Sequence, residues 1–144
     1  MALPTKVTMF SKNWLESICW GGFLAGFYLL LIRNFNIGSW KPEVLMIALA
    51  TAITEEMVFS GFVAGYLEKI QKGKWINWLI ISLMVMAVRL PILWFVYRLG
   101  FRESLGVILF AGASGVMNAW VRVKTGNVTG SILARTGINM AVLG

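Results

Sequence analysis

Long apolar runs separated by short charged turns are the feature that most restricts how this chain can fold. The first run, Trp14 to Ile32, is long enough to cross a bilayer, which takes about 20 apolar residues. Hydrophobic residues make up 58% of the 144 positions, against roughly 45 to 50% in a soluble domain. We therefore expect an all-α fold, a polytopic membrane helix bundle of about five transmembrane helices.

Turn residues and charges set the expected helix boundaries. Pro42 lies where proline is favoured, in the first turn of a helix. Pro91 should break or kink the third helix and push Leu90 out of helical geometry. We divide the chain into 1–41, an N-terminal lead-in and first transmembrane helix, and 42–144, a four-helix membrane core. The five expected helices run from Trp14 to Ile32, about Pro42 to Ile70, Trp75 to about Arg98, about Glu103 to Val121, and Thr129 to the C-terminus.

The basic residues, which give the chain a net charge of +7, indicate its orientation in the membrane. Lysines and arginines gather in cytoplasmic loops and meet anionic lipid, so the expected partner is the lipid bilayer and not nucleic acid. Five passes put seven basic residues on the side of the N-terminus and four on the other, which favours a cytoplasmic N-terminus in the cell membrane. The seven are Lys6, Lys12, Lys69, Lys72, Lys74, Arg122 and Lys124, and the four are Arg33, Lys41, Arg98 and Arg102.

The chain contains no histidine, and Cys19 is its only cysteine. The missing histidines remove the commonest ligand for zinc and copper and the commonest general base near neutral pH. We therefore expect no metal site and no cofactor.

Two adjacent glutamates, Glu55 and Glu56, lie in the middle of the second apolar run. They are roughly 18 to 20 Å from the start of that helix at 1.5 Å per residue, which is close to the bilayer midplane. An ionised side chain at that depth costs between about 3 and 15 kcal/mol unless partners or protonation relieve it. Arg89 and Arg135 are the two basic residues left inside the membrane, and their guanidiniums can bind carboxylates in pairs. The sequence therefore predicts a closed ionic cluster without net charge.

Two shorter polar side chains are placed to complete this cluster. Ser60 comes one helical turn after Glu56, and Asn139 comes one turn after Arg135. Which glutamate faces which arginine stays open, because adjacent helical residues point about 100° apart. Such a cluster can hold a bundle together or bind a ligand without doing any chemistry.

Three segments in order, TEEMVFSGF, AVRLP and RTGIN after a VKTGN turn, resemble the CAAX protease and bacteriocin-processing family of intramembrane proteases. The core of that family, as in CAAX prenyl protease 2, reads EExxxR, then a histidine with an aromatic or apolar residue four positions before it, then HxxxN. The resemblance covers Pro42 to Gly144. It implies a helical membrane fold, an endopeptidase activity on prenylated or other hydrophobic peptides, and roles such as bacteriocin immunity.

The resemblance assigns a role to each matching position. Glu55 matches the glutamate that activates the attacking water, and Glu56 matches its neighbour. Ser60 stands where the motif arginine would be, and Arg89 stands in place of the first histidine, which helps to hold and deprotonate the water.

The remaining motif positions are Arg135, in place of the second histidine, and Asn139, which together would form the oxyanion hole. Arginine stays protonated near neutral pH, so Arg89 can neither accept a proton nor bind a metal. A cation beside a carboxylate also makes that carboxylate a weaker base. Arg135 with Asn139 could still supply donors to an oxyanion.

We therefore expect a catalytically degenerate relative, a pseudoprotease that binds a hydrophobic or lipidated peptide or a partner protein beside Glu55. Two alternatives stay open. The first is an active, glutamate-dependent intramembrane endopeptidase, of CAAX-processing type or acting in bacteriocin immunity. The second is a small subunit of an ion or proton pathway, in which the glutamates and arginines relay protons.

Overall fold

The computed structural model describes residues 13–33, 41–70, 73–96, 98 and 100–143, and the regular elements there are helices. Four apolar segments are long enough to cross a membrane, namely Trp14–Leu31, Pro42–Ile70, Lys74–Phe95 and Ser104–Thr125. The predicted all-α membrane bundle is confirmed, and the chain is a multi-pass membrane protein. The helices are α1 (Trp14–Arg33), α2 (Pro42–Glu56), η1 (Met57–Val63), α3 (Ala64–Ile70), α4 (Lys74–Pro91), η2 (Ile92–Val96), α5 (Phe101–Thr125) and α6 (Thr129–Leu143).

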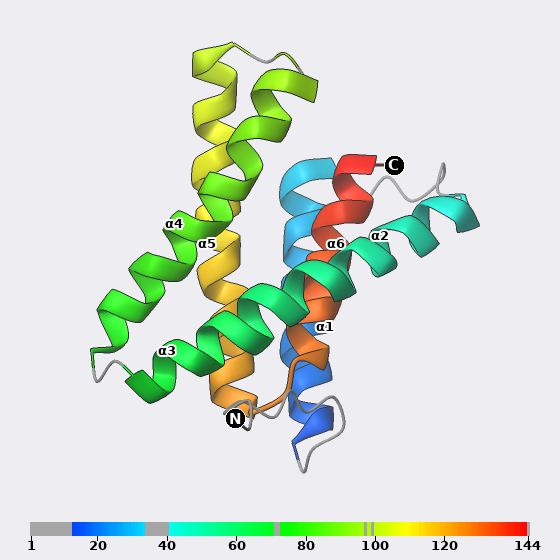
Figure 1. The fold of residues 1–144 in the computed structure, drawn as a ribbon. Coiled ribbons are helices and arrows are strands. Elements are labelled where there is room, and N and C mark those ends of the chain that lie inside the picture. Colours follow the sequence, from blue (N-terminus) through cyan, green and yellow to red (C-terminus); the bar gives the residue numbers. More distant parts are fainter. Residues whose placement is uncertain (1–12, 34–40, 71–72, 97, 99, 144) are drawn as a thin grey trace.

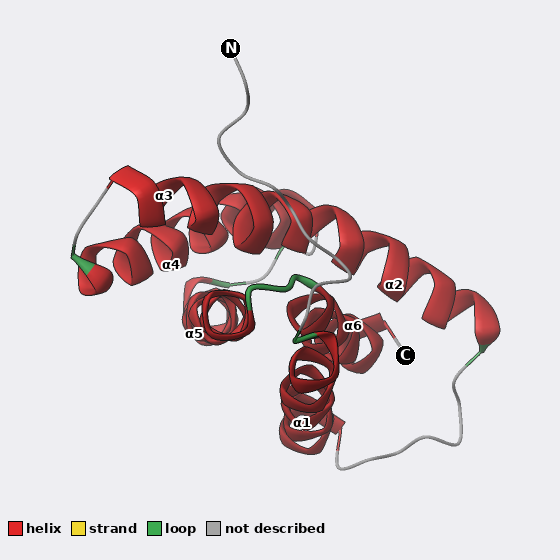
Figure 2. Cartoon of the chain, turned by 90° about the horizontal axis from the view of Figure 1, so that it is seen from below, coloured by secondary structure: helices red, strands yellow, loops and turns green. Residues whose placement is uncertain are grey.

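Two pairs of helices are joined by one long helix that crosses both (Figure 1). One pair is α1 with α6 and the other is α4 with α5, while α2, η1 and α3 run diagonally across them. Viewed from below, α2 and α3 lie across α5 and α6, with α1 beyond α6 (Figure 2). The 15-residue α6 therefore packs against α1, α2 and α5, which is why most of its described side chains are buried.

The contact between α1 and α6 is close enough for the two backbones to touch. A Cβ atom at Gly21 would overlap the backbone of Gly130, and one at Gly130 would overlap the backbone of Ser17. The Ser17 hydroxyl uses this proximity: it accepts from the Gly130 amide at 2.8 Å and donates to the Asn127 carbonyl at 3.3 Å. The first helix is therefore an integral part of the packing around α6.

The second and third expected helices have the predicted extents but not the predicted regularity. The run from Pro42 to Ile70 is continuous, yet its middle, η1, is a π-helix that begins directly after Glu56. The expectation that Leu90 would leave helical geometry is wrong, since α4 continues through Leu90 and Pro91. Proline removes one backbone donor and crowds the preceding turn, and the change to a π-helix in η2 follows immediately.

The connection between α5 and α6 is the VKTGN turn that the sequence predicts. Gly126 ends α5 in the left-handed conformation, with φ of 69°, and its amide bonds the Arg122 carbonyl at 2.8 Å. The Asn127 Oδ1 then accepts from the Thr129 amide at 2.9 Å at the start of α6. The expected lead-in and the connector before α2 lie almost wholly outside the described residues, and the division into 1–41 and 42–144 stays a prediction.

Candidate active site

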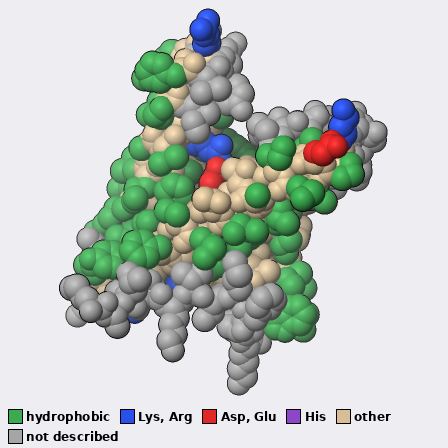
Figure 3. Space-filling model, turned by 45° about the vertical axis from the view of Figure 1, so that its right-hand side comes forward, with side chains coloured by type: hydrophobic (Ala, Val, Ile, Leu, Met, Phe, Trp, Pro, Cys, Tyr) green, Lys and Arg blue, Asp and Glu red, His purple; other side chains and the backbone are tan. Residues whose placement is uncertain are grey.

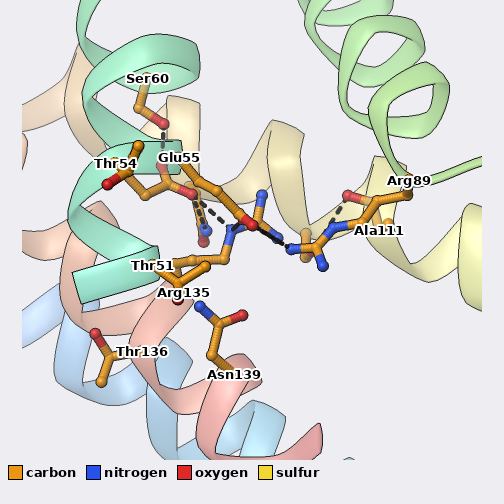
Figure 4. A network of polar contacts seen from close by, with 12 residues as sticks. Thr51, Thr54, Glu55, Ser60, Arg89, Ala111, Arg135, Thr136 and Asn139 are labelled. Carbon is orange, nitrogen blue, oxygen red and sulfur yellow. Dashed lines mark hydrogen bonds and ion pairs between the residues drawn. The ribbon is translucent and has the colours of Figure 1, made fainter. Parts of the chain in front are cut away.

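The two glutamates lie at the end of α2, where this helix crosses α6 and approaches α4. Figure 4 shows Glu55 directed toward Arg89 across the gap between α2 and α4. The Nη2 of Arg89 donates to both oxygens of Glu55, at 2.9 Å to Oε1 and 2.7 Å to Oε2. The Nε of Arg135 lies 3.1 Å from Oε2 of Glu55 and 3.0 Å from Oε1 of Glu56. Arg135 therefore bridges the two carboxylates, while Arg89 holds only the first.

Glu56 is the deeper of the two acids and is surrounded by donors. Its side chain is 1% exposed. Its Oε1 accepts from Arg135 and also from the Nδ2 of Asn118 at 3.0 Å, and its Oε2 accepts from the hydroxyl of Ser60. Asn118 is itself held by the Tyr28 hydroxyl, which donates to its Oδ1 at 3.4 Å. Both oxygens of this buried carboxylate are thus satisfied, as a charge at bilayer depth requires.

The cluster of Glu55, Glu56, Arg89 and Arg135 is closed on one side and open on the other. The side chains of Glu55 and Arg89 are 22% and 27% exposed, whereas that of Arg135 is 2% exposed. Figure 3 shows acidic and basic side chains side by side at the bottom of a hollow in the surface. Arg135 and Glu56 therefore form the interior of the cluster, and Glu55 and Arg89 form its accessible edge. With all four groups ionised, the cluster has no net charge.

The π-helix η1 shapes the inner wall of the site. It begins at Met57, immediately after Glu56, and three consecutive residues in it, Phe59, Ser60 and Gly61, are buried. This brings the Ser60 hydroxyl onto Glu56, in the place where the family resemblance expects an arginine. Short π segments inside α-helices are frequent at functional sites.

Asn139, the last of the predicted site residues, contacts the backbone of α2. Its Nδ2 donates to the Ala48 carbonyl at 3.2 Å, so it ties α6 to the backbone of α2 instead of completing the cluster. The reason is the helix crossing: one turn beyond Arg135 on α6 corresponds to about two turns before Glu55 on α2.

Sequence reasoning missed two members of the network, Asn118 on α5 and Tyr28 on α1. Asn118 is a lone polar residue in an otherwise apolar stretch of α5, and it is fully buried. A buried amide at membrane depth requires a partner, and that signal could have pointed to Glu56. Tyr28 had no comparable signal, because a tyrosine in an apolar run also occurs at membrane interfaces.

The geometry limits the chemistry that the cluster can do. A general base for water needs a carboxylate oxygen within reach of the water and free to take its proton. Both oxygens of Glu55 instead accept from guanidinium groups, which are permanent cations and cannot take the proton onward. Among the described residues, no group of three or more His, Cys, Asp or Glu side chains could hold a metal ion.

Comparison with known protein families gives a match that covers the four charged residues of the cluster. The family model for type II CAAX prenyl endopeptidase Rce1-like proteins matches residues 37–141, which include α2 to α5 and most of α6. Searches of the curated proteins and of the solved structures found no match. The matched segment is well over half of the 144 residues and contains both glutamates and both arginines of the cluster. The chain therefore belongs to the type II CAAX prenyl endopeptidase Rce1-like family.

Proposed function

We propose that this protein is a catalytically degenerate member of its family, a pseudoprotease that binds a hydrophobic or lipidated peptide, or a partner protein, beside Glu55. The observation that carries the proposal is the contact of the Arg89 Nη2 with both oxygens of Glu55, at 2.9 and 2.7 Å. Both oxygens of a carboxylate held in this way are occupied by charge-assisted hydrogen bonds, so neither is free to take a proton from water. Hydrolysis would require Glu55 to leave a strong ion pair before it could activate water.

The binding role rests on the open edge of the cluster. The side chains of Glu55 and Arg89 are each about a quarter exposed, and Figure 3 shows acidic and basic side chains together in a hollow of the surface. Nearby side chains on η1 and α4 are apolar and exposed, among them Val58 and Val88. A hydrophobic segment lying in the membrane can reach such a hollow and find a polar group at its base. We propose the cell membrane as its location, with the N-terminus in the cytoplasm.

A cleavage assay on the purified full chain in detergent tests the catalytic half of the proposal. Farnesylated and unmodified hydrophobic peptides ending in a CAAX sequence would be incubated with the wild type and with Glu55→Gln, and products would be followed by mass spectrometry. We expect the same background in both. Cleavage by the wild type that disappears in Glu55→Gln would contradict degeneracy and establish the active endopeptidase.

A crosslinking assay tests the binding half. The farnesylated peptide, carrying a photoactivatable group, should crosslink to the wild type and be displaced by unlabelled peptide. Thr51→Trp places a large side chain one turn from Glu55 on the same face of α2 and should reduce the crosslink several-fold. Met46→Trp, on an exposed position of the same helix about half a turn around, is the matched control and should not. Equal crosslinking by both variants would contradict binding beside Glu55.

A further inference from the structure

A cavity that is separate from the two glutamates lies at the opposite end of α4 from Arg89. It has a volume of about 570 Å³, within the range of roughly 300 to 1,000 Å³ of small-molecule sites. We call it the α3–α5 cavity. It is lined by Ala64, Glu68, Lys74, Asn77, Trp78, Ile81, Trp120, Val123 and Lys124.

The cavity lies where the apolar spans end. Lys74 is the first residue of the apolar segment Lys74–Phe95. Lys124 is next to the end of the segment Ser104–Thr125, and Glu68 is close to the end of the segment Pro42–Ile70. Trp78 and Trp120 follow one turn further in, as tryptophans do at the level of lipid headgroups. Figure 1 shows the end of α3, the start of α4 and the end of α5 at the same end of the bundle. The cavity therefore opens at the membrane interface, with an apolar inner wall and a charged mouth.

The charges at the mouth favour an anion. The Glu68 carboxylate is engaged by Arg122 at 2.9 Å, so it does not neutralise the lysines. Among the described residues, neither Lys74 nor Lys124 has a carboxylate within ion-pair distance. The Nζ of Lys124 instead lies over two tryptophan rings, 4.2 Å from the centroid of Trp20 on α1 and 4.9 Å from that of Trp120. Such contacts hold the ammonium in place beside the cavity that Lys124 lines.

Asn77 adds a preference for a ligand that also donates hydrogen bonds. Its Nδ2 donates to the Leu67 carbonyl at 3.3 Å, while its buried Oδ1 has no hydrogen-bond partner among the described residues. A buried acceptor without a partner is unfavourable. A hydroxyl group entering the cavity would satisfy it.

We propose that the α3–α5 cavity binds the headgroup of an anionic glycerophospholipid that carries hydroxyl groups, as phosphatidylglycerol does. The phosphate faces Lys74 and Lys124, the headgroup hydroxyls face Asn77, and the acyl chains leave along the apolar wall of Trp78 and Ile81. The site is separate from the glutamate cluster and does not depend on the proposed function.

Lipid titrations of the purified full chain in nonionic detergent, read by native mass spectrometry, test this assignment. We expect phosphatidylglycerol to bind more tightly than phosphatidylmethanol, which has the same charge without hydroxyls, and phosphatidylcholine to bind weakest. Lys74→Gln with Lys124→Gln should weaken phosphatidylglycerol binding about 30-fold, at about 1 kcal/mol for each lysine near anionic lipid. Lys41→Gln with Arg102→Gln removes the same charge at the other end of the bundle and should leave binding unchanged.

Three results would overturn the proposal. Equal weakening by the two double variants would mean that net charge, and not the cavity, attracts the lipid. Equal binding of phosphatidylglycerol and phosphatidylmethanol would remove the role of the hydroxyl groups. Displacement of the lipid by soluble glycerol phosphate at similar concentration would identify a site for free phosphate in place of a lipid site.

Discussion

At the scale of single residues, Arg135 is the side chain on which the buried cluster depends. It is 2% exposed, and its Nε lies within 3.1 Å of both carboxylates. Arg89, by contrast, contacts only Glu55 at the open edge of the site. The same residue type in the same network therefore has two different energetic roles.

Replacing Arg135 should be far more damaging than replacing Arg89. Arg135→Met leaves Glu56 without its cationic partner in the interior, and breaking a buried pair in this way costs about 3 to 5 kcal/mol. Arg89→Met should cost about 1 kcal/mol, because Glu55 keeps Arg135 and is partly exposed. Unfolding of each variant in detergent micelles measures the difference.

Arg122→Met, at the more exposed pair with Glu68, is the control and should cost less than about 1 kcal/mol. Equal losses for Arg135 and Arg89 would contradict this ranking.

Asn118 should matter because it donates to the same buried acid. Asn118→Leu keeps the number and branching of the side-chain heavy atoms but removes a donor to Glu56, so we expect a loss of about 1 to 3 kcal/mol in the free energy of unfolding. Ser114→Ala, one turn earlier on α5, removes a hydroxyl that bonds only its own helix at the Ala111 carbonyl, and it should be close to neutral. A neutral Asn118→Leu would mean that Glu56 does not need this donor.

At the scale of the elements, the helices could be predicted from the sequence more fully than their irregularities. The first apolar run agrees closely with the extent of α1. Pro42 marks the start of α2, and the turn at Gly126 comes directly before α6. The π-helix η1 has no comparable signal, because its register depends on packing against neighbouring helices. The ion pairs follow from the need of charges at bilayer depth for partners, whereas the position of Asn139 depends on a helix crossing that the sequence does not specify.

The contact between α1 and α6 gives a prediction with an internal control. Gly21→Ala should destabilise the protein by about 1 to 3 kcal/mol, because the added methyl group overlaps the Gly130 backbone and forces the helices apart. Gly22→Ala, the next residue, meets nothing within 4 Å and should be neutral or stabilise by up to about 1 kcal/mol. Thermal unfolding of the two variants in one detergent compares them directly. If Gly22→Ala were the more damaging change, the register of α1 on α6 would be different.

At the scale of the whole molecule, the distribution of basic residues along the sequence predicts that the end of the bundle with the start of α4 and the end of α5 faces the cytoplasm. In a Cys19→Ser background, Gly73→Cys lies at that end, while Lys41→Cys and Arg102→Cys lie at the other. All three positions are exposed. In intact cells a membrane-impermeant maleimide should label positions 41 and 102, and should label position 73 only after permeabilisation. The reverse pattern would contradict the predicted orientation.

The central claim is that Glu55 is held by Arg89 and is therefore not available as a base, and a double-mutant cycle tests it most directly. The free energies of unfolding of Glu55→Ala, Arg89→Ala and the double variant would be compared with that of the wild type. Residues in direct contact couple by about 0.5 to 3 kcal/mol, so the double change should cost less than the sum of the single changes by at least about 1 kcal/mol. Additive losses would show that the two side chains do not interact, and would contradict the account.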